Sequence, residues 1–129
     1  MSRTEQERAN LDLVLAMFEA VLNPMDSGAV DRFISTDNIQ HNQSVEPGVA
    51  SLKAFLDMIR EQTPEAVHDV KRAFVDGDHV TVHYHVRRWP GDSGWAVIDI
   101  FRVEDGLIAE HWDVMQDVVA GGPNPIGPF

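Results

Sequence analysis

The chain has 129 residues, 43% of them hydrophobic and 24% charged, a composition that is ordinary for a folded protein and argues against disorder. Ten Lys and Arg against 21 Asp and Glu give a formal charge of −11, and so acidic a surface argues against nucleic acid and anionic membranes as partners. The sequence contains no cysteine, which excludes disulfides, thiolate zinc sites and cysteine nucleophiles.

Residues 1–129 are predicted to form a single domain, because a chain of this length is long enough to bury one core. Residues 1–30 show no basic-then-apolar signal pattern. No apolar run approaches the roughly 18 residues that a membrane span needs. A cytoplasmic protein without membrane partners is therefore expected.

The first predicted helix follows Thr4, whose spacing to Glu7 is that of a capping box, and it ends at Asn23-Pro24. Its apolar positions recur at helical spacing: Leu11, Val14, Leu15, Phe18, Val21 and Leu22. A shorter second helix is expected to begin at Asp26.

A third helix is predicted from Pro47, which suits a first helical turn, to Thr63-Pro64. The polar stretch before it, residues 35–46, is expected to be irregular.

The hydrophobic period changes to two after the third helix, which predicts strands near 66–75, 79–86, 95–103 and 107–118. Asp76-Gly77-Asp78 and Asp105-Gly106 are typical of hairpin turns between them. The Gly- and Pro-rich segment 121–125 is expected to run over the surface. Three helices followed by an antiparallel meander predict an α+β fold, with the helices on one face of a strongly curved sheet.

The side chains that are candidates for acid/base catalysis lie on two of these strands. His83 and His85 are two residues apart, so their side chains share one face. The next strand carries Asp99 inside the apolar run 95–101. A buried carboxyl of this kind has a raised pKa, which suits a general acid or base.

The Asp105-Gly106 turn predicts the pairing of the last two strands. If it is a two-residue loop, Asp99 lies opposite Trp112, and the same count places Phe101 opposite Glu110 and Trp95 opposite Gln116. Asp99, Trp112 and Gln116 are then expected to face one space. His111 and Asp113 are expected to face away from it, unless a bulge reverses the register.

Other interpretations of these residues stay open. Asp99 is also consistent with a structural acid bonded to the backbone or an Arg, and the His pair with the solvent face of an edge strand. Two His on alternate strand positions plus a carboxylate also resemble half a metal site. Trp112 is consistent with a core residue, and His41 with a loop residue.

Two segments resemble the signatures of a known family. Residues 38–42, NIQHN, followed by Pro47-Gly48 at the start of an apolar helix, resemble one signature of the SnoaL-like polyketide cyclases. Residues 97–106 and 108–116, VIDIFRVEDG and IAEHWDVMQ, resemble the ending that this family shares with related aldol-condensation proteins. The likeness covers nearly the whole chain. The family that it resembles belongs to the nuclear transport factor two-like superfamily. One departure is Gln43, where relatives often carry Pro.

The resemblance implies a cone-shaped fold with a central pocket between helices and sheet, and a homodimer through the outer face of the sheet. It also implies an Asp that acts as acid and base in an aldol ring closure without metal or cofactor, beside a His on the preceding strand. The matching residues here are Asp99 and His85.

The function expected from these observations is cofactor-independent acid/base chemistry on a small hydrophobic carbonyl-bearing ligand, by aldol cyclisation or isomerisation. Asp99 would take a proton from carbon, and His85, with His83 or His41, would donate to the enolate oxygen. The expected ligand-binding residues are His41, Trp95, Phe101, Trp112 and Gln116.

Two alternatives belong to other classes. The first is a non-catalytic module that binds a small ligand in the same fold. The second is a hydrolase of the epoxide-hydrolase type, which needs two carboxylates bridged by Arg and a water-positioning Tyr or Asn. Tyr84 is the only Tyr, and its parity is expected to turn it away from Asp99.

The homodimer is expected to form through an apolar stripe on the sheet face opposite the pocket. The predicted stripe consists of Val80, Val82, Tyr84, Val86, Ile98 and Ile100.

Overall fold

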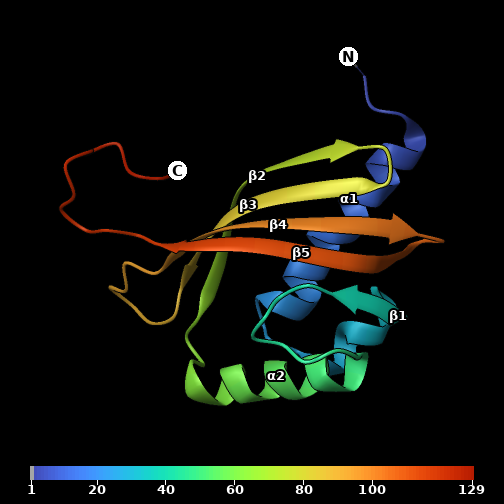
Figure 1. Ribbon diagram of the computed structural model, residues 1–129, viewed down its shortest axis with the longest axis horizontal. Helices are drawn as coiled ribbons and strands as arrows, with labels where there is room; N and C mark the ends of the chain where they lie inside the picture. Colours follow the sequence, from blue (N-terminus) through green and yellow to red (C-terminus); the bar gives the residue numbers. More distant parts are fainter. Residues whose placement is uncertain (1) are drawn as a thin grey trace.

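A computed structural model describes residues 2–129 and confirms an α+β fold. The helical elements are α1 (Glu5–Met17), the π-helical turn η1 (Phe18–Leu22), the 3₁₀ helix η2 (Ser27–Arg32) and α2 (Val49–Gln62). The strands are β1 (Ile34–Gln40), β2 (Val67–Asp76), β3 (His79–Arg87), β4 (Trp95–Glu104) and β5 (Leu107–Asp117). Figure 1 shows the strands stacked in the order β1-β5-β4-β3-β2.

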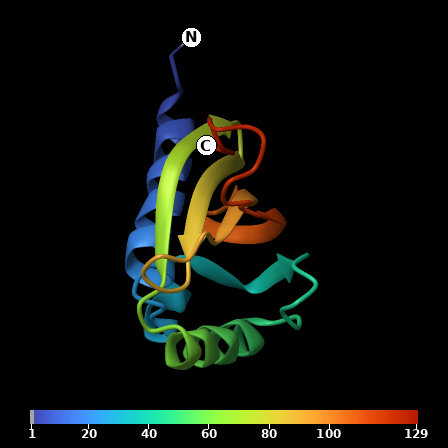
Figure 2. The same cartoon turned by 90° about the vertical axis from the view of Figure 1, so that its left-hand side faces the viewer.

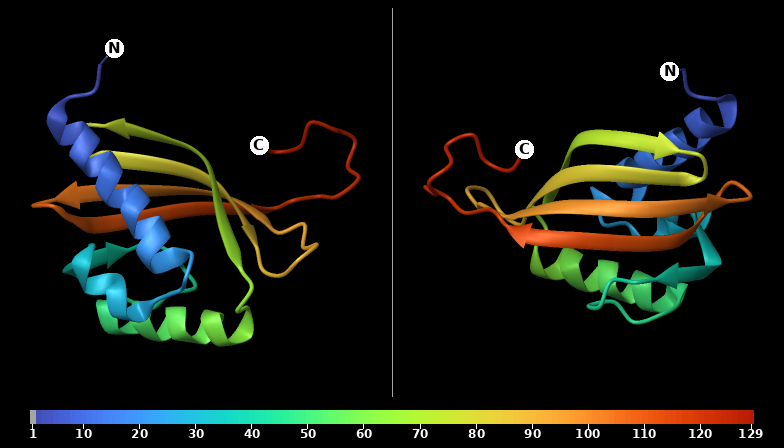
Figure 3. Two further views of the ribbon diagram at one scale, coloured as in Figure 1. Left: turned by 180° about the vertical axis from the view of Figure 1, so that it is seen from behind. Right: turned by 45° about the horizontal axis from the view of Figure 1, so that its top comes forward.

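The helices lie on one face of a curved sheet, as predicted (Figure 2). α1 crosses that face diagonally, and α2 lies beyond the β1 edge, so none of the helices in residues 2–129 covers the other face of the sheet (Figure 3). The core fills the space under α1 and η1. There Phe18 packs edge-on against Tyr84 at 4.9 Å between ring centroids and against Phe101 at 6.0 Å.

The start of α1 confirms the predicted capping box. The Glu7 backbone N–H donates to Thr4 Oγ1 at 3.0 Å, and the Thr4 N–H donates to Glu7 Oε1 at 2.9 Å. The other Glu7 oxygen, Oε2, accepts from the Gly77 N–H at 3.0 Å, so the same side chain ties the helix to the β2–β3 hairpin. The predicted end of the helical region at Asn23 is also correct, although its last turn is π-helical.

The expectation of an irregular segment at 35–46 is wrong for its first half. Residues 34–40 form β1, which pairs in parallel with β5 and places Gln40 beside His111. β1 is a polar edge strand in which only Ile34 is buried, so no apolar alternation marks it in the sequence. Its pairing with β5, which is distant in sequence, produces the strand.

The β4–β5 hairpin confirms the predicted turn but not the predicted register. Asp105 and Gly106 both have positive φ, 51° and 76°, and Glu104 pairs with Leu107. Beyond Val103, which pairs with Ile108, Arg102 pairs with Glu110, so Ala109 is an extra residue in a β-bulge. Every later pair moves by one position, and Asp99 therefore lies opposite Asp113 rather than Trp112.

The pairing of β3 with β4 corrects the expected faces of the sheet. Val82 pairs with Asp99 and Tyr84 with Val97, so the apolar residues of β3 share the face of Asp99. The predicted dimer stripe is therefore wrong for Val80, Val82, Tyr84 and Val86, which are buried under the helices. The apolar alternation of β3 faces the core because α1 covers that side of the sheet.

The last residues leave the sheet at the end of β5 and are mostly exposed, in agreement with the predicted surface course; Figure 1 shows them looping beyond the strand ends before the chain turns back. The Phe129 ring rests on the face opposite the helices, 4.6 Å from the ring of His85 and 5.4 Å from that of His83. Within residues 2–129, the helices are too short or too polar for any of them to cross a membrane.

Candidate active site

Asp99 is the buried carboxyl around which the site is built. Its side chain projects from β4 into the space under the helices, and the residue is 2% exposed. The Tyr84 hydroxyl donates to Asp99 Oδ2 at 3.0 Å, and Asp99 Oδ1 lies 3.2 Å from His111 Nε2. Burial raises the pKa of Asp99 more than the contacts with His111 and Tyr84 lower it. The predicted burial and chemical character of Asp99 thus agree with its surroundings.

Tyr84 stays a hydrogen-bond donor in this setting. Burial, together with the charge and hydrogen bond of Asp99, raises the pKa of the Tyr84 hydroxyl well above its usual value. The protonated hydroxyl holds one oxygen of Asp99 and leaves the other free to react.

His111 reaches Asp99 because of the bulge in β5. Its Nδ1 lies 2.7 Å from Gln40 Oε1, an oxygen that also accepts from the Asn42 N–H at 2.9 Å. Because Gln40 Oε1 is an acceptor, the His111 proton lies on Nδ1. Nε2, the nitrogen that faces Asp99, is then an acceptor in the neutral ring and a donor only when the ring is protonated. The ring of Phe101 stacks on that of His111 at 4.9 Å and fixes its plane.

The Asp99–His111 pair is suited to share one proton. Burial lowers the pKa of His111, but the close contact with the Asp99 carboxyl and its negative charge raise it more, so that the net change is upward. Both groups therefore hold a proton more readily than they do in water, and either can pass it to a third group bound beside them.

Two buried atoms of this pair still lack a hydrogen-bond partner. Asp99 Oδ1 and His111 Nε2 are 3.2 Å apart, yet the direction of the contact does not meet hydrogen-bond geometry, and neither atom has another partner within residues 2–129. Unsatisfied buried polar atoms are costly, and active sites are a common place for them. They give the pair free capacity to bind a ligand.

Asp113 completes the polar cluster. Its Oδ2 accepts from Asn42 Nδ2 and lies 4.0 Å from His111 Nε2. Asp99, His111 and Asp113 offer ligand atoms that all lie within 4.8 Å of one another, and could hold a metal ion as a two-carboxylate, one-imidazole set. The same three groups can equally act as proton carriers without a metal.

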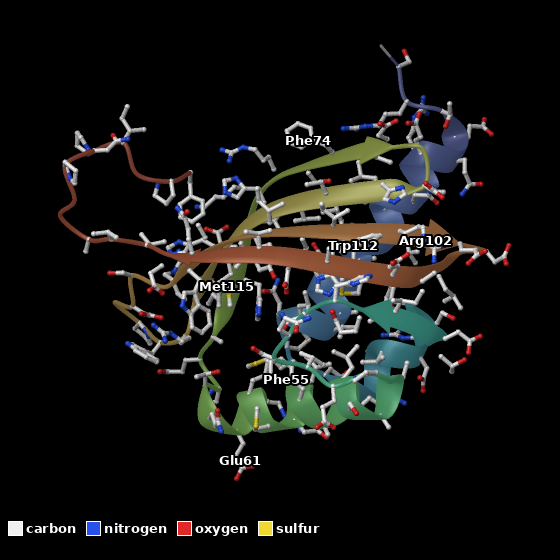
Figure 4. All side chains as sticks on the ribbon, in the orientation of Figure 1. Phe55, Glu61, Phe74, Arg102, Trp112 and Met115 are labelled. Atoms are coloured by element: carbon white, nitrogen blue, oxygen red, sulfur yellow. The ribbon has the colours of Figure 1, made fainter. Side chains whose placement is uncertain are left out.

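These groups line the inner end of a cavity. The inner chamber has a volume of about 140 Å³, close to that of an apolar cavity that accepts a benzene ring. Its other walls are apolar side chains from η1 and α2: Val21, Leu22, Leu52, Phe55, Leu56 and Ile59. Figure 4 shows Phe55 pointing from α2 toward the sheet, whereas Glu61 points away.

A wider chamber of about 540 Å³ adjoins it and shares Asn42, Phe55, Tyr84 and Asp113 with it. Its walls carry the sulfur-containing side chains of Met25, Met58 and Met115, and the rings of Trp89, which is exposed, and Trp95 form its rim.

The rim of the wider chamber is held in place by Arg88. The guanidinium lies 4.5 Å from the ring centroid of Trp89 and 4.4 Å from that of Trp95. It also forms two hydrogen bonds to Asp92, at 2.8 and 3.0 Å. The charge of Arg88 is thus paired with Asp92, and the rings of Trp89 and Trp95 present flat apolar surfaces at the rim.

Of the residues expected at the site, Asp99, Phe101 and Trp95 line these chambers, whereas His83 and His85 do not. The expectation that His85 neighbours Asp99 is wrong, since His85 projects from the opposite face of β3. There Ser93 O lies 2.7 Å from its Nε2 and Arg87 Nη1 lies 3.0 Å from its Nδ1, so both nitrogens are engaged. Arg72 contacts His83 Nδ1 in the same way.

His41, Trp112 and Gln116 also lie away from the chambers. Trp112 projects from the outer face of β5, where its ring stacks on His41 at 5.0 Å between centroids (Figure 4). Gln116 lines a shallow groove on the same face. The missed bulge explains the errors for Trp112 and Gln116, because a shift by one residue exchanges the two faces of a strand.

The sequence-based analysis missed residues that do line the inner chamber: His68, Gln40, Asn42, Tyr84, His111 and Asp113. A signal for His111 and Asp113 was present in the apolar run Leu107-Ile108-Ala109, which does not alternate as a regular half-buried strand does; Ile108 and Ala109 are both buried. The expectation that Tyr84 points away from Asp99 is wrong for the same reason as the dimer stripe. The alternation of β3 alone does not say which of its faces Asp99 shares.

Residues 14–111 match the family model of the SnoaL-like domain. No curated protein sequence matches the chain. Among solved structures, TsrD from Streptomyces laurentii is similar, with 25% identity over 86% of this chain and 91% of that chain and a TM-score of 0.71.

Two further solved structures share the fold. A protein of Sinorhizobium meliloti, provisionally named a polyketide cyclase, has 24% identity over 80% of this chain and 94% of its own, with a TM-score of 0.68. A protein of Jannaschia sp. CCS1, provisionally named a SnoaL-like polyketide cyclase, has 21% identity over 89% and 90%, with a TM-score of 0.74. The arrangement of helices and curved sheet agrees with the expected cone-shaped fold of the nuclear transport factor two-like class.

Proposed function

The chain belongs to the SnoaL-like domain family, and from that premise we propose that it is a small-molecule enzyme performing acid/base chemistry on a carbonyl substrate. The observation that carries the proposal is the Asp99–His111 pair, with its two free atoms at the buried end of an apolar cavity. His111 takes the role that was expected of His85. No metal or cofactor is needed for this chemistry.

The proposed reaction begins with the substrate carbonyl oxygen at His111 Nε2 and its α-carbon at Asp99 Oδ1. The carboxylate removes a proton from the α-carbon and the C–H electrons move into the carbonyl. His111, whose raised pKa favours the protonated imidazolium, donates its Nε2–H to the enolate oxygen and stabilises it. In an aldol closure, the enolate carbon then bonds to a second carbonyl carbon of the same substrate, whose oxygen receives the proton from Asp99. In an isomerisation, that proton returns to a different carbon.

The apolar walls support this assignment. A dry cavity keeps Asp99 basic toward carbon and strengthens the hydrogen bond to the enolate. The inner chamber admits about one ring, and the wider chamber, with Trp89 and Trp95, extends the space for a flat substrate. A small, flat, hydrophobic ketone therefore fits the proposal.

The experiment that tests it is hydrogen exchange at carbon. 2-Tetralone, a flat bicyclic ketone, is incubated with the protein in D₂O at pH 7, and the loss of its α-proton signals is followed by NMR. We expect exchange faster than in buffer, abolished by Asp99→Asn and His111→Leu. The matched control is Asp12→Asn, the same change at an exposed position of α1, which is expected to keep the wild-type rate. Exchange that survives Asp99→Asn would refute the proposal.

A second candidate, a hydrolase that activates water, is favoured by one specific observation. His111 lies between two carboxylates, 3.2 Å from Asp99 and 4.0 Å from Asp113, with Tyr84 bonded to the first and Asn42 to the second. The imidazole takes the bridging position for which an Arg was expected. Incubation with styrene oxide in H₂¹⁸O distinguishes the two functions, since only the hydrolase would form labelled diol faster than buffer alone does.

We further propose that the chain forms a homodimer through the face of the sheet that no helix covers. Ile98 and Val114 project from that face with 42% and 72% of their surface exposed, beside Ile100 and Trp112. Apolar surface of this kind is usually covered in solution. Sedimentation at micromolar concentration should show a dimer, and Val114→Lys should give a monomer. A wild-type monomer would contradict the proposal.

A further inference from the structure

His68 is a partly buried histidine in the wall of the cavity, in addition to the Asp99–His111 pair. It lies on β2, opposite Val86, and its side chain lines both the inner and the wider chamber. The backbone N–H of His68 donates to Asn23 Oδ1 at 3.0 Å, which fixes the start of β2 against the end of the helical region. The ring therefore has a defined position at the junction of the two chambers.

The His68 ring carries hydrogen-bonding capacity that the protein does not use. Nδ1 is buried and has no hydrogen-bond partner among residues 2–129. A neutral imidazole has one N–H donor and one acceptor nitrogen, so a ligand can bond to it in either role. Burial lowers the pKa of His68 to about 4, so the ring is neutral near pH 7.

His68 on β2, Tyr84 on β3 and Asp99 on β4 form a row of polar groups across the sheet. The His68 ring centroid lies 6.1 Å from that of Tyr84, and the Tyr84 hydroxyl bonds to Asp99. The wider chamber that His68 lines also has apolar residues in its wall, Ile59, Val86 and Val97 among them. An unsatisfied polar atom in such a wall favours a ligand with an oxygen at that place, because an apolar ligand would leave it unsatisfied.

We propose that His68 is a ligand-binding residue that forms a hydrogen bond through its neutral imidazole to an oxygen of a flat, mainly apolar ligand. This inference rests on the proposed function only in placing the ligand in the same cavity. It adds that the ligand carries a hydroxyl or carbonyl oxygen on its ring system in addition to the group that faces Asp99 and His111.

The test uses 2-naphthol, a flat bicyclic ring with one hydroxyl, and measures its Kd at pH 7 by calorimetry. His68→Leu keeps a side chain of similar apolar size but removes the hydrogen bond, and we expect about tenfold weaker binding. His68→Gln restores a donor and an acceptor and should bind within about threefold of wild type. The control His79→Leu, on the opposite face of the sheet, should leave the Kd unchanged.

A direct readout in the wild-type protein accompanies the variants. Addition of 2-naphthol should shift the ¹⁵N resonances of the His68 imidazole, which a ring with only a packing role would not show. Unchanged ¹⁵N resonances, or equal Kd values for wild type and His68→Leu, would overturn the inference. Absence of binding to the wild-type protein would overturn it too.

The outcome separates this inference from the proposed function. Loss of 2-naphthol binding in His68→Leu, together with no exchange of 2-tetralone by wild type, would refute the enzyme and retain the ligand-binding role of His68. Exchange of 2-tetralone that depends on Asp99, together with equal 2-naphthol binding by wild type and His68→Leu, would retain the enzyme and refute the ligand-binding role of His68.

Discussion

Replacement of Asp99 by Asn separates a catalytic role from a structural one. The introduced amide can accept the Tyr84 hydroxyl through its oxygen and donate through its nitrogen to His111 Nε2, because that ring nitrogen is an acceptor in the neutral tautomer that Gln40 favours. Both contacts of the buried carboxyl are thereby kept, and an ionisable group leaves an apolar site. We expect the free energy of unfolding at pH 7 to change by less than about 1 kcal/mol, or to rise by that amount.

Asp99→Ala provides the comparison for magnitude. It leaves the Tyr84 hydroxyl without its acceptor, removes the charge that faces His111 Nε2 and also removes packed volume, so we expect a loss of about 3–5 kcal/mol. Urea unfolding followed by tryptophan fluorescence gives both free energies, and the exchange of 2-tetralone gives the activity of each variant. A stable, inactive Asp99→Asn protein is the expected result. If Asn destabilises as much as Ala does, the charge itself holds the fold together, and Asp99 is a structural partner of His111 rather than a base.

Four further outcomes are expected from the same structure. The pKa of His68 is about 4 in the folded protein and about 6.5 in the unfolded chain, so between these pH values the unfolded chain binds a proton at His68 and the folded protein does not. Urea unfolding should therefore show a loss of up to about 3 kcal/mol between pH 7 and pH 4 that His68→Gln removes, and an unchanged slope in that variant would contradict the assignment. Leu56→Ala, at a core position that is 1% exposed, should lower the free energy of unfolding by about 2–5 kcal/mol, and a smaller loss would show that the core collapses around it. Thr4→Ala, which removes half of the capping box, should lower it by about 1 kcal/mol in the same assay. Dialysis against EDTA should leave the exchange of 2-tetralone unchanged, whereas loss of activity that Zn²⁺ or Mn²⁺ restores would mean that Asp99, His111 and Asp113 hold a metal.

Features set by neighbouring residues could be predicted from the sequence. The capping box of Thr4 and Glu7 depends on four successive residues, and the Asp105-Gly106 turn depends on the ease with which Asp and Gly adopt positive φ. The burial of Asp99 followed from the apolar residues on both sides of it. Each of these signals lies within a short segment, so no knowledge of the fold was required.

Features set by packing between distant segments could not be predicted in this way. β1 is a strand because β5 offers it an edge, and its own residues carry no strand pattern. The bulge at Ala109 accompanies the burial of both Ile108 and Ala109, of which Ile108 belongs to the core under the helices. The register of β3 against β4 passes through the loop 88–94, which is too long to fix it, and this is why His85 was expected beside Asp99.

The bulge at Ala109 also sets how this hairpin tolerates changes in length. Deletion of Ala109 would turn the bulged segment into a regular ladder in which Arg102 still pairs with Glu110, so the cavity would keep its polar groups. Insertion of one residue directly after Glu110 would instead rotate His111 and Asp113 to the outer face and bring their neighbours into the cavity. Within the same hairpin, one indel position is therefore neutral for the chemistry and another erases it without replacing a single residue. For an engineer or a diverging lineage, strand length at this point is a control on activity separate from the identity of the side chains.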